Sequence, residues 1–174
     1  AVATRKRKLF SPKLFAGVGF TSYRSGHSFI PGEGNIDYGQ AAALTYGVEL
    51  EFIFPFDNNK WSCNLEPSTI LYRSSGKNSQ GTDVPIEYNT VNIMLWFRYT
   101  SFLNEKVKLC FNGGAGKDVK QLKMIPALGA GLAYSRFMLE YRYFYEKGVL
   151  NGYFDQSQGA SFTNMSLVAK VSLF

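Results

Sequence analysis

The stretch that most constrains the fold runs from Leu44 to Phe56 and reads LTYGVELEFIFPF. Its even-numbered residues are all apolar and become increasingly aromatic, whereas its odd-numbered residues include Gly47 and the carboxylates Glu49 and Glu51. Strict alternation of this kind indicates a β-strand whose two faces meet different environments. The fold depends on which of these faces points outward.

Length and composition favour one domain built around a closed sheet. The chain has 174 residues, enough for one sizeable core, with 16% aromatic and only 18% charged residues. Average domains carry about 25% charged residues. No apolar run reaches the roughly 20 residues that a membrane-spanning helix needs. A closed β-barrel spans a membrane without one. Because the chain opens with polar and basic AVATRKRKLF, we expect a mature form whose signal peptide has been removed.

The net charge of +6 and the two cysteines add few functional possibilities. The dense basic run is Arg5 to Lys8, and the other cations are scattered. Nucleic-acid binding needs a basic stripe on a defined surface, so we expect no nucleic-acid partner. Residues 1–12 are predicted to form a basic N-terminal arm in water or near anionic headgroups. Cys63 and Cys110 match no metal-ligand spacing, so we expect two free thiols, no metal and no cofactor.

Seven further stretches alternate in the same way as the first. The eight expected strands cover 13–23, 44–56, 61–73, 86–100, 107–116, 122–134, 137–146 and 160–174. Pro67 removes a ladder hydrogen bond inside the third, so we expect a local bulge there. Short connections (57–60, 101–106, 135–136) alternate with longer ones (24–40, 74–85, 147–159), apart from a tight turn near Lys117. This asymmetry is typical of outer-membrane barrels.

The volumes of the two side-chain sets decide which face is outside. The lumen of an eight-stranded barrel is just wide enough for side chains to fill it. The polar face carries many glycines and fits such a lumen: Gly17, Gly19, Gly47, Gly114, Gly116, Gly129 and Gly131. The bulky apolar face must then point outward, where only lipid would accommodate so large a patch. We therefore predict an all-β protein, an eight-stranded antiparallel transmembrane up-and-down β-barrel over residues 13–174 with a polar, side-chain-filled lumen.

Aromatic residues gather beside the expected short turns and are predicted to form a membrane-interface girdle, with two tyrosines as candidates for the opposite girdle. The set is Phe54, Phe56, Trp61, Phe97, Tyr99, Phe102, Tyr134 and Phe137, with Tyr143 and Tyr145 at the other end.

Charged residues of both signs share the inward face, and buried charges are costly unless they are paired. The predicted lumen network is Glu49, Glu51, Glu66, Arg98, Lys108, Glu140, Arg142 and Lys170. Such a network could line an ion path or act as a structural plug. We favour the plug, because eight strands leave little room for an aqueous channel.

The stretches LFAGVGF, SCNLEPSTILY and GLAYSRFMLEYRY carry a resemblance that covers nearly the whole chain from Leu14. In these stretches the sequence resembles the small Gram-negative outer-membrane β-barrels of the OmpA and OmpX type, and the porin-like outer membrane protein beta-barrel group. The resemblance implies a place in the bacterial outer membrane, contact with its lipid and insertion by its assembly machinery. It also implies that the terminal Phe174 is the assembly signal, although Leu173 and Val171 hold the apolar phase of that strand.

The expected function is a structural, accessory or interaction role, including a place as a subunit of a larger envelope complex that is contacted through the long loops. No catalytic residue is predicted. The alternatives are a narrow low-conductance porin, a soluble lipocalin-like ligand-binding barrel, and an outer-membrane barrel enzyme. The enzyme would use His27 as a general base, since His commonly has this role.

Overall fold

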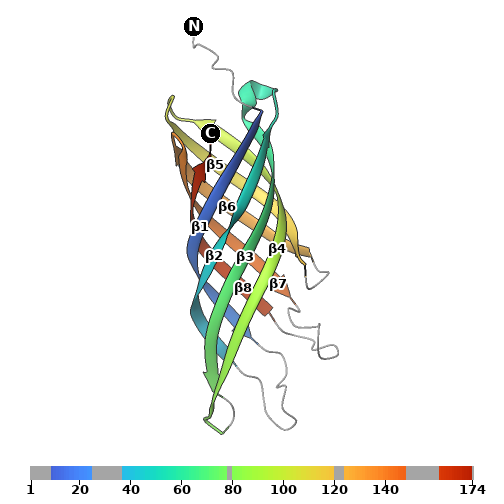
Figure 1. Ribbon diagram of the computed structural model, residues 1–174, viewed down its shortest axis with the longest axis vertical. Helices are drawn as coiled ribbons and strands as arrows, with labels where there is room; N and C mark the ends of the chain where they lie inside the picture. Colours follow the sequence, from blue (N-terminus) through green and yellow to red (C-terminus); the bar gives the residue numbers. More distant parts are fainter. Residues whose placement is uncertain (1–8, 25–36, 78–79, 120–123, 148–160, 174) are drawn as a thin grey trace.

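The computed structural model describes residues 9–24, 37–77, 80–119, 124–147 and 161–173. Eight antiparallel strands follow one another around a closed barrel, and β1 pairs with β8 to complete it (Figure 1). The strands are β1 Phe10–Arg24, β2 Asp37–Ile53, β3 Trp61–Lys77, β4 Asp83–Phe102, β5 Val107–Asp118, β6 Met124–Tyr134, β7 Phe137–Lys147 and β8 Ser161–Ser172. The predicted fold class is thus confirmed.

Each strand alternates between lipid and lumen as the sequence predicts. On β4, Ile93, Leu95 and Phe97 are about half exposed, whereas Met94, Trp96 and Arg98 are buried. The exposed apolar residues continue around all eight strands and form one outward belt, with Val18, Leu44, Leu65, Phe111, Leu128, Leu139 and Leu167 among them. A belt of this size is stable only against lipid.

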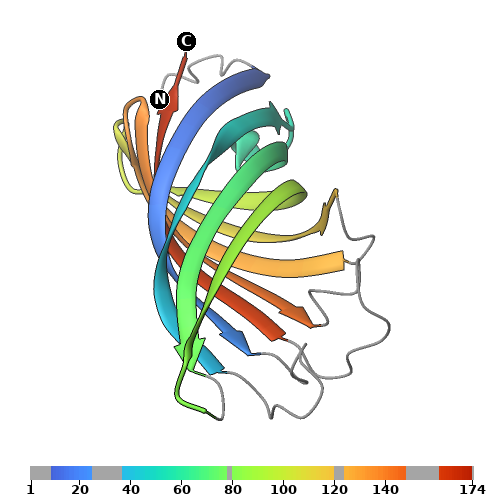
Figure 2. The same ribbon diagram turned by 60° about the horizontal axis from the view of Figure 1, so that its bottom comes forward.

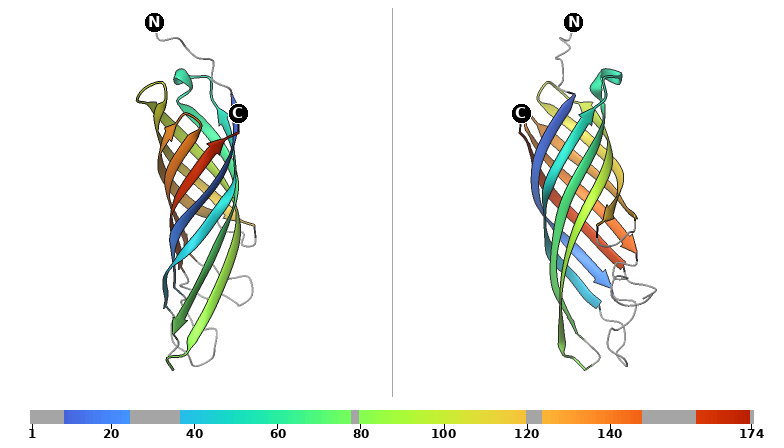
Figure 3. Two further views of the ribbon diagram at one scale, coloured as in Figure 1. Left: turned by 60° about the vertical axis from the view of Figure 1, so that its left-hand side comes forward. Right: turned by 45° about the vertical axis from the view of Figure 1, so that its right-hand side comes forward.

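The barrel wall is taller on one side. Strands β1 to β4 have 15, 17, 17 and 20 residues, whereas β5 to β8 have 12, 11, 11 and 12. The β3–β4 hairpin therefore extends beyond the other strands, away from the end where β1 begins and β8 ends (Figures 2 and 3). Its outer face is polar there, with an exposed Arg73–Glu87 ion pair of 2.9 Å. We call this the long-loop end, and the opposite end the short-turn end.

The structure corrects several predicted boundaries. β1 begins at Phe10, so residues 10–12 belong to the barrel and not to the arm. β2 begins at residue 37, seven residues earlier than expected, and ends before Phe54. The expected loop 74–85 is mostly paired strand, because β3 continues to Lys77 and β4 starts at Asp83. These segments are polar since they leave the membrane, and the sequence pattern alone had indicated a loop.

Pro67 does not cause a bulge, so that prediction was wrong. The pairs Gly47↔Ser68 and Leu50↔Leu65 lie on either side of it in the same register. The carbonyl of Trp61 accepts a hydrogen bond from the N–H of Phe54, so odd-numbered residues of β3 bond towards β2. Pro67 therefore removes a single bond of the β2–β3 ladder, and its pairing with β4 continues without interruption.

Gly113 and Gly114 are neighbours on β5 that face opposite sides of the wall. A Cβ added to Gly114 would lie 2.5 Å from the carbonyl oxygen of Leu95 and 2.9 Å from the Trp96 ring. At Gly113 the nearest atom, on Leu128, is 3.9 Å away. We expect Gly114→Ala to lower the free energy of unfolding by about 1–3 kcal/mol, because the added methyl group would overpack the core. Gly113→Ala should change it by less than about 0.5 kcal/mol. Urea titration in lipid vesicles measures both, and equal losses would contradict the inward packing of β5.

Candidate functional site

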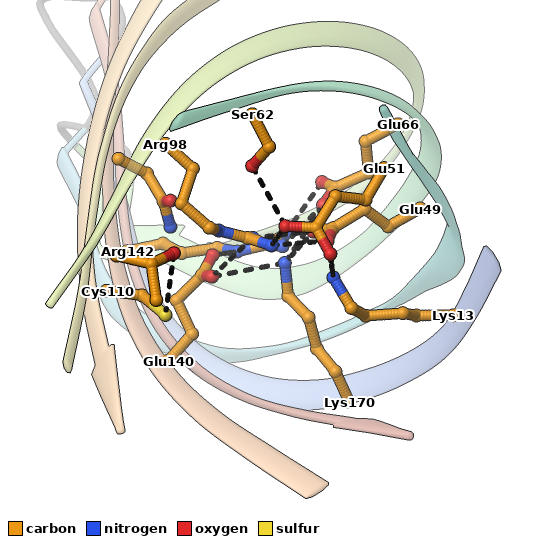
Figure 4. A network of polar contacts seen from close by, with 12 residues as sticks. Lys13, Glu49, Glu51, Ser62, Glu66, Arg98, Cys110, Glu140, Arg142 and Lys170 are labelled. Carbon is orange, nitrogen blue, oxygen red and sulfur yellow. Dashed lines mark hydrogen bonds and ion pairs between the residues drawn. The ribbon is translucent and has the colours of Figure 1, made fainter. Parts of the chain in front are cut away.

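The candidate site is a network of ion pairs that crosses the lumen (Figure 4). Most of its residues lie in the parts of their strands that are nearer the short turns. Six strands supply its charged members, and all of them are buried: Lys13 from β1, Glu49 and Glu51 from β2, Glu66 from β3, Arg98 from β4, Glu140 and Arg142 from β7, and Lys170 from β8. We call these eight residues the lumen network.

Arg98 occupies the middle of the lumen network and uses all of its guanidinium nitrogens. Its Nη1 donates to Glu49 Oε1 at 2.7 Å and to Glu51 Oε1 at 3.1 Å. Its Nη2 donates to Glu49 Oε2 at 2.9 Å and to Glu140 Oε2 at 3.2 Å. Nε donates to Asn112 Oδ1 at 2.7 Å. Planar, forked donation of this kind is the strong and geometrically specific form of carboxylate pairing.

Arg142 holds a second pair of carboxylates and is also packed by aromatic rings. Its Nη1 and Nη2 donate to the two oxygens of Glu66 at 2.8 and 2.5 Å, and its Nε donates to Glu140 at 2.5 Å. The guanidinium carbon lies 4.8 Å from the centroid of the Phe15 ring and 5.5 Å from that of Trp96. These rings pack against the guanidinium and add cation–π attraction.

Two lysines complete the lumen network from the strands that close the barrel. Lys13 Nζ lies 2.6 Å from Glu49 Oε1 and 2.7 Å from Glu51 Oε2, and the Ser62 hydroxyl donates to Glu51 Oε1 at 2.9 Å. Lys170 Nζ contacts Glu49, and it also lies 3.1 Å from Glu140 and 3.5 Å from Glu66. Because Lys13 and Lys170 come from β1 and β8, the ion pairs tie the β1–β8 seam to β2 and β3.

The lumen network has no net charge, since four carboxylates face four cations. Buried charges are tolerated only when they are paired and hydrogen-bonded. Every carboxylate here contacts at least two cations. This arrangement holds strands together, and it leaves no excess charge to attract an ion.

Buried side chains fill the lumen on both sides of the lumen network along the barrel axis. Towards the long-loop end, a buried cluster comprises Met94, Trp96, Ile125, Ala127 and Phe144. Towards the short-turn end, the buried side chains of Ile53, Thr100, Cys110 and Met138 follow it. The charged layer is thereby covered on both sides by buried side chains, some apolar and some polar.

The structure brings together seven of the eight residues predicted for the lumen network. Lys108 is on the inward face but lies closer to the short-turn end, half-buried, with its Nζ 5.7 Å from the centroid of the Phe102 ring. Sequence reasoning missed Lys13, although it shares the parity of Phe15 and Gly17 and could have been found by extending that alternation. It also missed Ser62 and Asn112, because hydrogen-bond partners depend on register.

The predicted interface aromatics lie towards the two ends of the outward belt. At the short-turn end, the rings of Trp61 and Tyr99 are 5.0 Å apart and those of Phe54 and Phe56 stack at 5.4 Å. The other predicted residues at this end are exposed: Phe97, Phe102, Tyr134 and Phe137. Towards the long-loop end of β7, Tyr143 is exposed and Tyr145 is half-buried. Phe174 and His27 lie outside the described residues.

The described part of the chain contains both cysteines and offers no cluster that could hold a metal ion. Cys63 and Cys110 are free thiols, one half-buried and one buried. Within that part, no group of three or more His, Cys, Asp or Glu side chains is placed to hold a metal ion. None of its helices has the length and apolar character required to cross a membrane.

Comparison of the sequence with known proteins finds no matching family model and no matching curated protein. Comparison of the structure finds solved proteins with a similar fold. The crystal structure of neisserial surface protein A matches with a TM-score of 0.57 at 13% identity, over 93% of this chain and 97% of that one. The chain has the fold of the small outer-membrane β-barrels.

A second match is the outer membrane enzyme PagL, with a TM-score of 0.50 at 14% identity over 91% of this chain and 98% of that one. At these identities the likeness concerns the fold alone. The barrel fold and the apolar belt around it together place the chain in a bacterial outer membrane.

Proposed function

We propose that this protein is a closed structural or accessory barrel of the outer membrane, without catalytic activity, which serves other envelope components as an anchor or subunit. One observation carries the proposal: the lumen holds a neutral network of four carboxylates and four cations, with a buried apolar cluster on its long-loop side. A pore that conducts ions needs a hydrated path with surplus polar groups, whereas this lumen uses its charges to bind its own strands together.

The interior also argues against a soluble lipocalin-like barrel. Such a barrel keeps an apolar cavity for its ligand. Here the corresponding space contains Arg98, Arg142 and their carboxylate partners. The exposed belt of large apolar residues would in addition face water.

The surfaces left for partners are those that leave the membrane. Within the described residues, they include the polar outer face of the tall β3–β4 hairpin. A partner of an accessory barrel would bind these surfaces and not the filled lumen. Hydrolysis of outer-membrane lipid by the purified chain, lost in His27→Ala, would contradict the non-catalytic part of the proposal.

We expect the purified barrel to show no steady conductance steps in planar bilayers, because the charges of the lumen network are paired with one another and buried side chains fill the lumen on both sides of them. A general porin reconstituted in parallel serves as the positive control. A variant of the protein, Trp96→Gly, removes the largest ring next to Arg142. Brief conductance steps in this variant alone would show that the assay detects ion flow once the lumen is less completely filled. Well-defined steps from the unmodified protein would overturn the closed-barrel proposal in favour of a narrow pore.

A further inference from the structure

The charged residues that the structure describes are divided unevenly between the parts of the barrel. The lumen network is neutral. Among the other described residues, the short-turn end has four cations and two carboxylates: Lys60, Lys106, Lys108 and Arg136 against Asp57 and Glu105. The described strands have five cations and five carboxylates at the long-loop end, and these cancel. The excess positive charge of the described residues therefore lies at the short-turn end.

Each of the three short turns places a cation beside interfacial aromatic residues. Lys60 precedes Trp61 in the β2–β3 turn, Lys106 lies in the β4–β5 turn after Phe102, and Arg136 precedes Phe137 in the β6–β7 turn. Lys106 and Arg136 are exposed. Lys60 is partly neutralised by Asp57, whose Oδ1 is 3.4 Å from its Nζ. We call Lys60, Lys106 and Arg136 the basic collar.

The basic collar runs around the barrel and is not confined to one side. Its three turns join β2 to β3, β4 to β5 and β6 to β7, and these strands follow one another around the closed sheet. In the sequence, Arg5 to Lys8 immediately precede β1, which starts at the same rim. A ring of positive charge matches the lipid annulus of a membrane protein better than it matches one docked macromolecule.

We propose that the basic collar binds the anionic headgroups of phospholipids in the leaflet next to the short turns. Interfacial Trp and Tyr rings lie at headgroup level, so the adjacent cations lie there too. Basic residues close to an anionic membrane surface are attracted to it, and salt weakens this attraction. This inference stands whether or not the lumen conducts.

The test uses Trp61 as the reporter in the full chain. The sequence has two tryptophans; Trp61 is 40% exposed on the collar, whereas Trp96 is 1% exposed inside the lumen. The protein is reconstituted into vesicles of brominated phosphatidylcholine, which quenches Trp61. Unbrominated phosphatidylglycerol or phosphatidylcholine is then added in increasing proportion, and the recovery of fluorescence reports which lipid displaces the quencher.

We expect phosphatidylglycerol to displace the brominated lipid roughly fivefold better than phosphatidylcholine at low salt, with little preference left in 1 M NaCl. The triple variant Lys60→Gln, Lys106→Gln and Arg136→Gln should lose most of the preference. The matched control Arg73→Gln, Lys77→Gln and Lys117→Gln removes the same charge from exposed residues of the long-loop end and should retain it. Equal displacement by both lipids, or equal loss of preference in the two triple variants, would overturn the proposal.

Discussion

Arg98→Met should lower the free energy of unfolding by about 3–5 kcal/mol, because it leaves buried carboxylates short of a cation. Methionine keeps most of the volume of the arginine stem, so the loss reports charge and hydrogen bonding more than a cavity. Three carboxylates lose a partner: Glu49, Glu51 and Glu140. Urea titration of the protein in lipid vesicles, followed by tryptophan fluorescence, measures the change.

Two controls separate pairing from mere crowding of the lumen. Arg98→Met combined with Glu49→Gln restores charge balance with three residues of each sign, so it should cost less than Arg98→Met alone although it removes more ion pairs. Arg73→Ala breaks the exposed Arg73–Glu87 pair and should cost less than about 1 kcal/mol. If the double variant were less stable than Arg98→Met, charge balance in the lumen would not be the source of the stability, and the prediction would be wrong.

The alternation of the chain was enough to predict the barrel and the direction of most side chains. Glu49 and Glu51 share a parity with Gly47, and this parity alone assigned them to the lumen. The cation that pairs with each carboxylate could not be predicted, since it depends on the register between strands far apart in the sequence. Glu66 and Arg142, which form a bidentate pair, are separated by 76 positions.

The packing of side chains in the lumen could not be predicted from the alternation either. Inward glycines were recognised as small residues, but the structure shows what stands opposite them. Gly47 pairs with Phe15, Gly114 with Trp96, and Gly116 with Met94. Each missing side chain makes room for a bulky one on the neighbouring strand, so the lumen is filled by unequal pairs. Predicting these pairs requires the register, which local alternation does not contain.

Leu95→Arg should lower the free energy of unfolding by about 2–4 kcal/mol in lipid, because it places a cation on the lipid-facing side of β4. Leu95 is 45% exposed and lies within the apolar belt, with Ile93 and Phe97 on the same face. The same change in a water-facing wall would be nearly neutral, since an exposed substitution usually costs within about 0.5 kcal/mol. The size of the loss therefore reports the solvent that surrounds the barrel.

The matched control for this variant is Ser75→Arg. Ser75 is exposed on the outer face of the β3–β4 hairpin beyond the belt, where Arg73 and Lys77 already face water. We expect its free energy of unfolding to stay within about 0.5 kcal/mol of the unmodified protein. A small effect at both positions would mean that water bathes the belt, and the transmembrane assignment would fail. A large effect at Leu95 alone would locate the membrane boundary on this hairpin between the two residues.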